Sequence, residues 1–432
     1  MIKKIFLILF SVTFFNQQVL AVSLFEALTE AYKNNPELNA ERENIGVSEQ
    51  DLKISKGNYL PSVIISGNKS QEDTNKLTNR AGNDATIKDV NPRTHLITIE
   101  QTLLDLGRGP NLQKNKIGIN LAITKLLKKE QEILLKAIEA YSGLILASEK
   151  SKINQRNLNL LERQVETDRA RLERGQINLS DLAQSEASLA GAQASFIQSE
   201  NEIVSSKLNY ENVIGTILDV NSLEKKFDTN FIFPESLNNA ITISKKNSPE
   251  LNIAKLEYEQ SEKDVFISRS DLSPSAKLSY ENSRSEDVSS TYDRRNKNIL
   301  KATVSWPIYS GGKNIASLNK SKNLKNRKKL LLDSAIKTND TNVAIAWSTL
   351  QSSKSLLNSV RSQVRAAEVA NEGITVEYES GIGRSTLDVI QSNSILLESK
   401  ISLAETERKY LLAQFKILQT IGLLTSDHLK LK

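Results

Sequence analysis

The sequence predicts a mainly α-helical, internally duplicated chain with long coiled-coil hairpins and a part built from four membrane-type β-strands. Three observations lead to this fold class. Short motifs recur at one fixed spacing, apolar residues keep a helical period over very long stretches, and a few short segments change to a period of two. The chain is 25% charged, 5% aromatic and negative in mean hydropathy, which is unlike a bundle of membrane helices.

Residues 1–21 have the pattern of a targeting segment. Lys3 and Lys4 precede an apolar run at 5–15, and Val19 and Ala21 occupy the small-residue positions of a cleavage site. The pattern predicts a secretory signal peptide; a membrane anchor is the alternative. A secreted chain without cysteine must be held together by packing and backbone ladders, because it has no disulfides.

The remainder of the chain is a tandem duplication. Three pairs of motifs have the same separation: PELN at 36–39 and 249–252, SEQDLKIS at 48–55 and SEKDVFIS at 261–268, and Pro-Ser at 61–62 and 274–275. Three matches at one separation are improbable by chance. We therefore expect a first structural repeat at 22–220, a second at 221–425, and a short C-terminal tail at 426–432.

Each repeat is expected to begin with shorter helical segments and to end in a long helical hairpin. Residues 24–56 have apolar positions at helical spacing, with Pro36 where a helix would start. Long helices are expected over 110–174, 178–214 and 314–420, the last one broken at 380–385. At ~1.5 Å per residue the longest helices reach on the order of 100 Å, so they must pack as antiparallel coiled coils.

The period changes to two between these helices. Strands are predicted at 62–66, 94–104, 276–280 and 299–309. In the last one Leu300, Val304 and Trp306 share one face and Lys301 takes the other. Polar loops at 67–93 and 281–298 are expected to connect the strands of each pair. The two hairpins then cover about 58–105 and 273–309.

Four such strands leave open edges if they stand alone. Strands with an apolar outer face and long loops are typical of outer-membrane barrels, where Trp306 and Tyr309 would be aromatic residues at the membrane interface. Lipid tolerates only closed barrels. The chain must therefore oligomerise to close a barrel, which we favour, or pack its strands in water as a sandwich.

Several motifs together resemble the TolC family of outer-membrane channels over residues 24–425. They are PELN before a helix, Leu-Pro-Ser at 60–62, WPIYSGG at 306–312, and a glycine followed by an aspartate at each helix break. The resemblance implies a homotrimer in which three chains give four strands each to one twelve-stranded barrel. Twelve helices then form a tunnel through the periplasm.

The resemblance also implies a function and partners. Members are passive exit ducts of tripartite drug efflux pumps or type I secretion systems. They work with a periplasmic adaptor (membrane fusion) protein and an inner-membrane transporter. The expected location is the outer membrane of a Gram-negative bacterium, in contact with its lipid and extending into the periplasm.

The stretch YESGIGRSTLDV at 378–389 is the second expected hairpin tip. In the family a tyrosine, an arginine and an aspartate bond across neighbouring hairpins and hold the tip shut. Tyr378, Arg384 and Asp181 match these latch residues. A further aspartate lines the pore constriction, and Asp388 matches it. Gln391 stands where some members have a second inward aspartate.

The turn residues of both tips are the expected docking site for the adaptor: Gly175, Gln176, Gly381 and Ile382. The second turn is one residue longer than the first, which leaves the register of Arg384 open. Simpler roles also remain open. Asp181 and Asp388 suit the first turn of a helix, while Arg384 and Tyr378 suit ordinary solvation and packing.

Catalysis has little support in the sequence. There is no phosphate-binding loop, nucleophile elbow or clustered acid pair, and His95 and His428 lack the spacing of metal ligands. We expect no enzyme activity, no cofactor and no metal. The formal net charge of +6 is mild for this length, so no nucleic-acid partner is expected. The alternative function is a periplasmic structural coiled-coil or adaptor protein.

Overall fold

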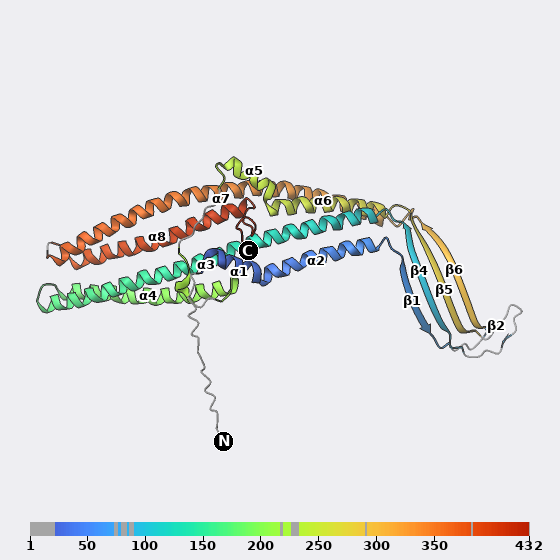
Figure 1. Cartoon of the computed structure of the whole chain (residues 1–432), viewed down its shortest axis with the longest axis horizontal. Helices are drawn as coiled ribbons and strands as arrows, with labels where there is room; N and C mark the ends of the chain where they lie inside the picture. Colours follow the sequence, from blue (N-terminus) through green and yellow to red (C-terminus); the bar gives the residue numbers. More distant parts are fainter. Residues whose placement is uncertain are drawn as a thin grey trace, which may run out of the picture.

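The molecule is an elongated rod with a β-sheet at one end and two helical hairpin tips at the other (Figure 1). The computed structural model describes residues 22–72, 77–78, 84–85, 90–216, 219–225, 233–289, 292–381 and 383–431. The predicted signal peptide at 1–21 lies outside the described residues, and so does Ile382. Among the described helices, none combines the length and apolar composition needed to cross a membrane.

The same order of elements occurs twice, as the repeated motifs predict. The first half contains α1 (Leu24–Asn34), α2 (Pro36–Gly57), β1 (Ser62–Lys69), β4 (Arg93–Leu104), α3 (Arg108–Glu173) and α4 (Leu179–Val213). The second contains α5 (Leu237–Asn247), α6 (Pro249–Ser270), β5 (Ser275–Ser289), β6 (Tyr292–Ser305), α7 (Lys313–Glu379) and α8 (Thr386–Thr420). A short pair, β2 (Leu77–Thr78) and β3 (Asp84–Ala85), lies between β1 and β4, and a 3-10 turn, η1 (Val220–Ser222), lies between the halves.

Local capping explains where the shorter helices begin. The Ser23 hydroxyl accepts a hydrogen bond from the Glu26 amide (3.2 Å), and the Glu26 carboxylate accepts one from the Ser23 amide (2.8 Å). Pro36 is the first residue of α2, behind the cap Asn35. Pro249 repeats this in α6, as its PELN motif predicts.

The apolar core lies near the middle of the rod, where α1, α5 and the C-terminal segment pack on α3, α7 and α8. Tyr141 is fully buried there, and its hydroxyl donates to the carbonyls of Val22 (2.7 Å) and Glu224 (3.1 Å). Gly422 closes α8 with a φ of +80°, and a Cβ on it would lie 2.4 Å from the Asn247 carbonyl oxygen. Only glycine allows the C-terminal segment to turn so close to the α5–α6 junction.

The strands form one antiparallel sheet in the order β1-β4-β5-β6. β1 and β6 are its edges, and within the described residues each pairs on one side only. The prediction of a polar loop over 281–298 is wrong. β5 runs to Ser289 and β6 starts at Tyr292, with pairing from Glu281↔Ile299 to Glu286↔Arg294. This half of the hairpin is polar on both faces, so it lacks the alternation that identifies a strand, yet its ladder satisfies the backbone all the same. β6 ends at Ser305, before Pro307, which cannot donate to a ladder.

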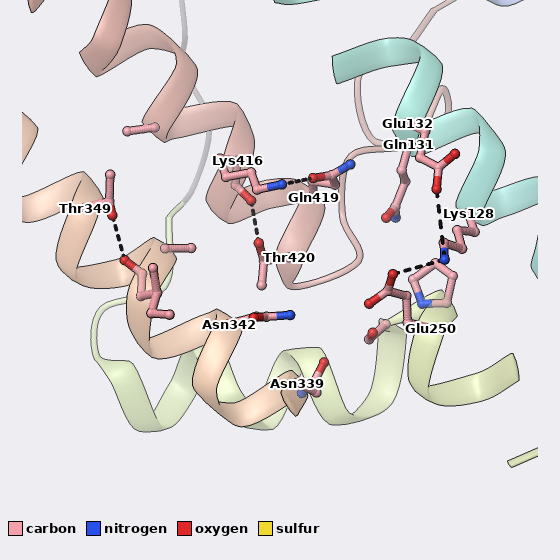
Figure 2. Close-up of a pocket in the computed structure, with 15 residues that line it drawn as sticks. Lys128, Gln131, Glu132, Glu250, Asn339, Asn342, Thr349, Lys416, Gln419 and Thr420 are labelled. Carbon is pink, nitrogen blue, oxygen red and sulfur yellow. Dashed lines mark hydrogen bonds and ion pairs between the residues drawn. The ribbon is translucent and has the colours of Figure 1, made fainter. Parts of the chain in front are cut away.

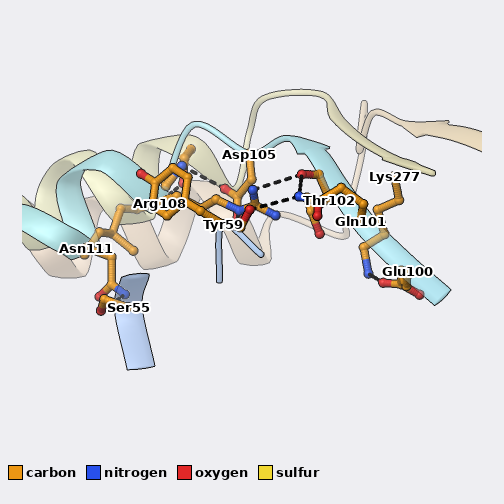
Figure 3. A network of polar contacts seen from close by, with 12 residues as sticks. Ser55, Tyr59, Glu100, Gln101, Thr102, Asp105, Arg108, Asn111 and Lys277 are labelled. Carbon is orange, nitrogen blue, oxygen red and sulfur yellow. Dashed lines mark hydrogen bonds and ion pairs between the residues drawn. The ribbon is translucent and has the colours of Figure 1, made fainter. Parts of the chain in front are cut away.

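A polar network fixes the junction between the sheet and the helices (Figure 3). The Arg108 guanidinium donates to the Thr102 carbonyl (3.0 Å) and lies 5.4 Å from the centre of the Tyr59 ring. The side-chain amide nitrogen of Gln101 donates to the Tyr59 carbonyl (3.1 Å). Asp105 accepts a hydrogen bond from the Gly107 amide (2.8 Å) at the start of α3. These contacts tie β4 and the residues that follow α2 to the start of α3.

Candidate functional site

The two hairpin tips lie side by side at the end of the rod far from the sheet (Figure 1). α3 ends in a turn where Gly175 has a φ of +70° and the Gln176 amide donates to the Arg171 carbonyl (2.9 Å). α7 ends in a similar turn, where Gly381 has a φ of +74°. A left-handed residue at this position is cheapest as glycine, which explains why both breaks carry one.

The next helix of each tip starts with a capping box. The Asn178 side chain accepts from the Asp181 amide (3.0 Å), and the Asp181 carboxylate accepts from the Asn178 amide (3.2 Å). Ser385 and Asp388 make the same exchange in α8, at 3.2 and 2.9 Å. Hydrogen bonds from the Ser385 backbone and hydroxyl hold the pKa of Asp388 below its ordinary value, and nearby Arg384 adds to the effect. Within one chain, both predicted aspartates are therefore the third helical residue of a capping box, and each one accepts from the backbone of its N-cap residue.

Arg384 pairs within its own hairpin. Its Nε donates to a Glu377 carboxylate oxygen at 2.6 Å, and both side chains are close to half exposed. An exposed pair of this kind contributes little to stability, because solvent screens it. Inside a single chain, Arg384 stiffens the turn of its own hairpin and does not reach the first one.

A buried carboxylate joins the two hairpins instead. Asp168 of α3 is completely buried, and it accepts hydrogen bonds from the Tyr378 hydroxyl (2.7 Å), the Ser185 hydroxyl (2.6 Å) and the Gln164 amide nitrogen (3.0 and 3.1 Å). The Tyr378 hydroxyl also lies 3.1 Å from the Thr386 hydroxyl. We call these residues the Asp168 network. It joins all four helices of the tips: α3 contributes Asp168 and Gln164, and α4, α7 and α8 contribute one hydroxyl each.

Tyr378 is held from its other side as well. The Arg171 guanidinium lies 4.2 Å from the centre of the Tyr378 ring and donates to the Tyr378 carbonyl (3.3 Å). Burial raises the pKa of Tyr378, and the hydrogen bond to the Asp168 carboxylate adds to this. The phenol therefore stays protonated at neutral pH and can donate to Asp168.

Sequence reasoning found Tyr378 but missed Asp168. The resemblance gives Asp181 as the aspartate of the latch, whereas within the chain the carboxylate next to Tyr378 is Asp168. A signal was present in the sequence. Leu161 and Val165 continue a buried stripe of α3, and Asp168 is the next position of that stripe. A carboxylate at a buried helical position requires hydrogen-bond donors from neighbouring elements.

Asp388 and Gln391 lie less than one turn apart near the start of α8, away from its buried face. That face includes Thr386, Val389 and Ser392. Gln391 is exposed and Asp388 is half exposed. Both side chains are thus available to a neighbouring surface or to a pore, as the predicted constriction requires.

The predicted interface aromatics lie at the helix side of the sheet. Trp306 and Tyr309 follow β6 and are 61% and 86% exposed. The Trp306 indole N–H donates to the Leu272 carbonyl (3.2 Å), so its polar edge is satisfied while its ring stays uncovered. This is the arrangement expected of an aromatic residue between lipid and water.

A polar cavity of about 620 Å³ lies near the middle of the rod, between α3, α6, α7 and α8 (Figure 2). Its walls carry the Lys128–Glu250 ion pair (3.1 Å) and the Lys416–Gln419 hydrogen bond (2.8 Å). Among the described residues, the amide nitrogens of Gln131 and Asn339 have no hydrogen-bond partner there. The described part of the chain contains no cluster of His, Cys, Asp and Glu suited to a metal ion. Its lining side chains come from four packed helices.

Comparison with known proteins relates the chain to outer membrane efflux and secretion proteins. The sequence model of the family described as "Outer membrane efflux protein" matches residues 27–216 and 240–423, one stretch in each half of the chain. The outer membrane efflux protein BepC of Brucella suis is 25% identical over 418 residues, covering 96% of this chain and 89% of that protein.

Two further proteins extend the comparison. The alkaline protease secretion protein AprF of Pseudomonas aeruginosa is 21% identical over 422 residues, covering 96% of this chain and 87% of that protein. The crystal structure of the CmeC outer membrane channel of Campylobacter jejuni superimposes with a TM-score of 0.79. The superposition covers 92% of this chain and 85% of the CmeC chain. The sequence identity is 14%, so the comparison shows a shared fold.

Proposed function

We propose, from the premise that this chain belongs to the outer membrane efflux protein family, the TolC family, that it forms a trimeric exit duct gated at its helical tips. Members of the family are non-enzymatic channels in the outer membrane of Gram-negative bacteria. This chain is accordingly an outer membrane efflux or secretion channel, and the alternative of a periplasmic coiled-coil or adaptor protein falls away. The trimer, the gate and the partners are the proposal.

The open sheet supports the trimer. β1 and β6 each have an edge that no described strand covers, and the apolar side chains on the sheet include Leu300 and Val304, which are 72% and 73% exposed. Lipid tolerates neither free backbone edges nor partial barrels. Pairing β6 of one chain with β1 of the next, three times over, closes a twelve-stranded barrel and covers every edge.

One observation supports the proposed gate. The Asp168 network joins the two hairpin tips within each chain. A duct made of three such chains opens at its tip when hairpins move apart. Any movement of α7 and α8 away from α3 and α4 must break the hydrogen bond from the Tyr378 hydroxyl to the Asp168 carboxylate, which costs free energy. The proposed resting state is therefore closed, with Asp388 forming the constriction ring and Gln391 following it.

The exposed tip turns are the proposed docking site for a periplasmic adaptor, through Gly175, Gln176 and Gly381, with Ile382 beside them in sequence. These turns are the part of each hairpin farthest from the sheet (Figure 1). An adaptor that binds them, together with an inner-membrane transporter, would supply the free energy that opens the network. The proposed cargo is an effluxed compound or a secreted protein, since BepC is named an efflux protein and AprF a protease secretion protein.

Conductance measurements test the proposal. The purified full-length protein is inserted into a planar bilayer, and single-channel currents are compared for wild type, Asp168→Asn and Asp181→Asn. We expect a small conductance for wild type and a larger one for Asp168→Asn. Asp181→Asn removes the charge from the capping box of α4 without touching Tyr378, so a larger conductance in that variant would indicate a latch made through Asp181 instead. Failure of intact protein to insert or conduct would overturn the proposed duct.

A further inference from the structure

The outward face of the sheet changes from apolar to cationic along its length. Directly paired residues of neighbouring strands lie on the same face. On β4 the odd-numbered side chains from Arg93 to Ile99 are exposed, and the even-numbered ones are half-buried. The exposed set is the outward face. Its apolar residues in the half nearer the helices include Ile97, Ile99, Tyr280, Leu300 and Val304.

The pairs of this face that lie farthest from the helices, before the register shift of β5 and β6, carry charge. Arg93 pairs with Lys69 of β1 and with Glu286 of β5, and Glu286 pairs with Arg294 of β6. Arg284 lies on the same face, two residues from Glu286. We call Lys69, Arg93, Arg284 and Arg294, grouped around Glu286, the basic cluster. The register brings it together from all four strands, which no single stretch of sequence indicates.

Glu286 organises the cluster but does not neutralise it. Its Oε1 accepts hydrogen bonds from Arg284 Nε (3.2 Å) and Nη2 (2.9 Å), and Arg294 Nη2 lies 3.6 Å away. The Arg284 and Arg294 side chains remain 53% and 60% exposed. Even if Asp287 is counted, whose carboxylate accepts from the Asn91 amide (2.7 Å), the end of the face keeps a net positive charge.

The position of the basic cluster along the sheet indicates which kind of molecule it meets. From Ser305 to Arg294, β6 spans roughly 36 Å along the strand, or about 28 Å along the barrel axis at the usual tilt of about 40°. That is close to the height of the apolar band of an outer-membrane barrel. With Trp306 at the boundary nearer the helices, the basic cluster falls at the opposite lipid–water boundary. The lipid there meets the protein through its headgroups.

We propose that the basic cluster binds a phosphate-bearing lipid headgroup of the outer leaflet. Guanidinium groups match phosphate oxygens with paired, charge-assisted hydrogen bonds. Arg284 and Arg294, held by one carboxylate with donors to spare, would clamp the phosphate, and Arg93 and Lys69 would add attraction. The inference rests on the proposed function, because it requires the sheet to lie in a membrane.

The test compares the two faces of the same strand. Arg294 and Arg295 are neighbours in sequence, but Arg295 pairs with Ser285 on the inward face, and Lys297 pairs with Ser283 there. Full-length protein in detergent is mixed with diphosphorylated lipid A or with its dephosphorylated form, and native mass spectrometry counts retained lipid. The variants are Arg284→Gln/Arg294→Gln and the matched control Arg295→Gln/Lys297→Gln.

Wild type should retain diphosphorylated lipid A in preference to the dephosphorylated form. The outward double variant should lose roughly tenfold in apparent affinity, about what one or two charge-assisted bonds provide, and the inward one should keep it. Glu286→Gln frees both arginines and should raise retention. Equal retention of the two lipids, or equal loss in both double variants, would overturn the proposal. Bilayer conductance of the same samples distinguishes failure of the headgroup site from failure of the proposed duct. Protein that conducts but shows no lipid preference refutes only the headgroup site.

Discussion

Replacing Tyr378 by phenylalanine should loosen the tip while leaving the helices intact. Tyr378 is 5% exposed, and its hydroxyl makes one hydrogen bond to the Asp168 carboxylate and one to the Thr386 hydroxyl. A hydrogen bond to a charged group contributes about 1.5–3 kcal/mol and a neutral one about 0.5–1.5 kcal/mol. The ring itself remains, so its packing against the Arg171 guanidinium is kept.

Of these two hydrogen bonds, only the one to Asp168 joins the two hairpins, because Thr386 belongs to the same hairpin as Tyr378. Asp168 keeps its donors from Ser185 and Gln164. The loss per chain that favours separated hairpins is therefore about 2 kcal/mol, the middle of the range for one bond to a charged group. That corresponds to a shift of roughly 30-fold per chain towards the separated hairpins. Single-channel recording should show a larger conductance or longer open periods for Tyr378→Phe than for wild type. Tyr258→Phe, on α6 and remote from the tip, is the matched control.

One result would refute this reasoning. If Tyr378→Phe forms the same oligomer as wild type and conducts no differently, the Asp168 network does not hold the tip. A larger conductance of Asp181→Asn in the same experiment would then place the latch between chains, where the family resemblance puts it.

Three further predictions concern the constriction, the core and alkaline stability. Asp388→Ala should raise the concentration of a trivalent cation needed to block the channel by roughly tenfold, because carboxylates around an axis attract cations. Gln391→Asp should lower that concentration. Unchanged block in both variants would exclude the proposed ring of Asp388 side chains. Gly422→Ala should destabilise the protein by roughly 2 kcal/mol or more in thermal unfolding, since its φ of +80° and the nearby α5–α6 backbone reject a Cβ. Gly191→Ala on α4, with open space around it, should not destabilise, and equal melting temperatures for the two variants would contradict the assignment. Burial raises the pKa of Tyr210 to about 12, so the folded state favours the neutral phenol. The contribution of this neutral phenol to folding stability is complete below about pH 10 and is lost as the pH rises towards 12. Tyr210→Phe should flatten the fall of melting temperature over that interval, and parallel curves would count against it.

The sequence alone determined the duplication, the long helices and their breaks. These features depend on local chemistry. Pro36 and Pro249 can start a helix but not continue one, glycine tolerates the left-handed turn at Gly175 and Gly381, and an apolar stripe of helical period persists for as long as the helix does. The apolar halves of the strands were equally visible, because their alternation is a property of neighbouring residues.

Only the tertiary structure decided which distant groups meet. The outer half of the β5–β6 hairpin is polar on both faces, so its strands depend on pairing with each other and were predicted as a loop. Asp168 and Tyr378 come from different halves of the chain, and their contact depends on how two hairpins pack. The basic cluster depends on the register of four strands, since a shift of one residue would send Arg294 to the inward face and Arg295 to the outward one. Periodicity along a chain fixes which face a residue occupies within its own element, but the neighbour across that face is set by packing between elements.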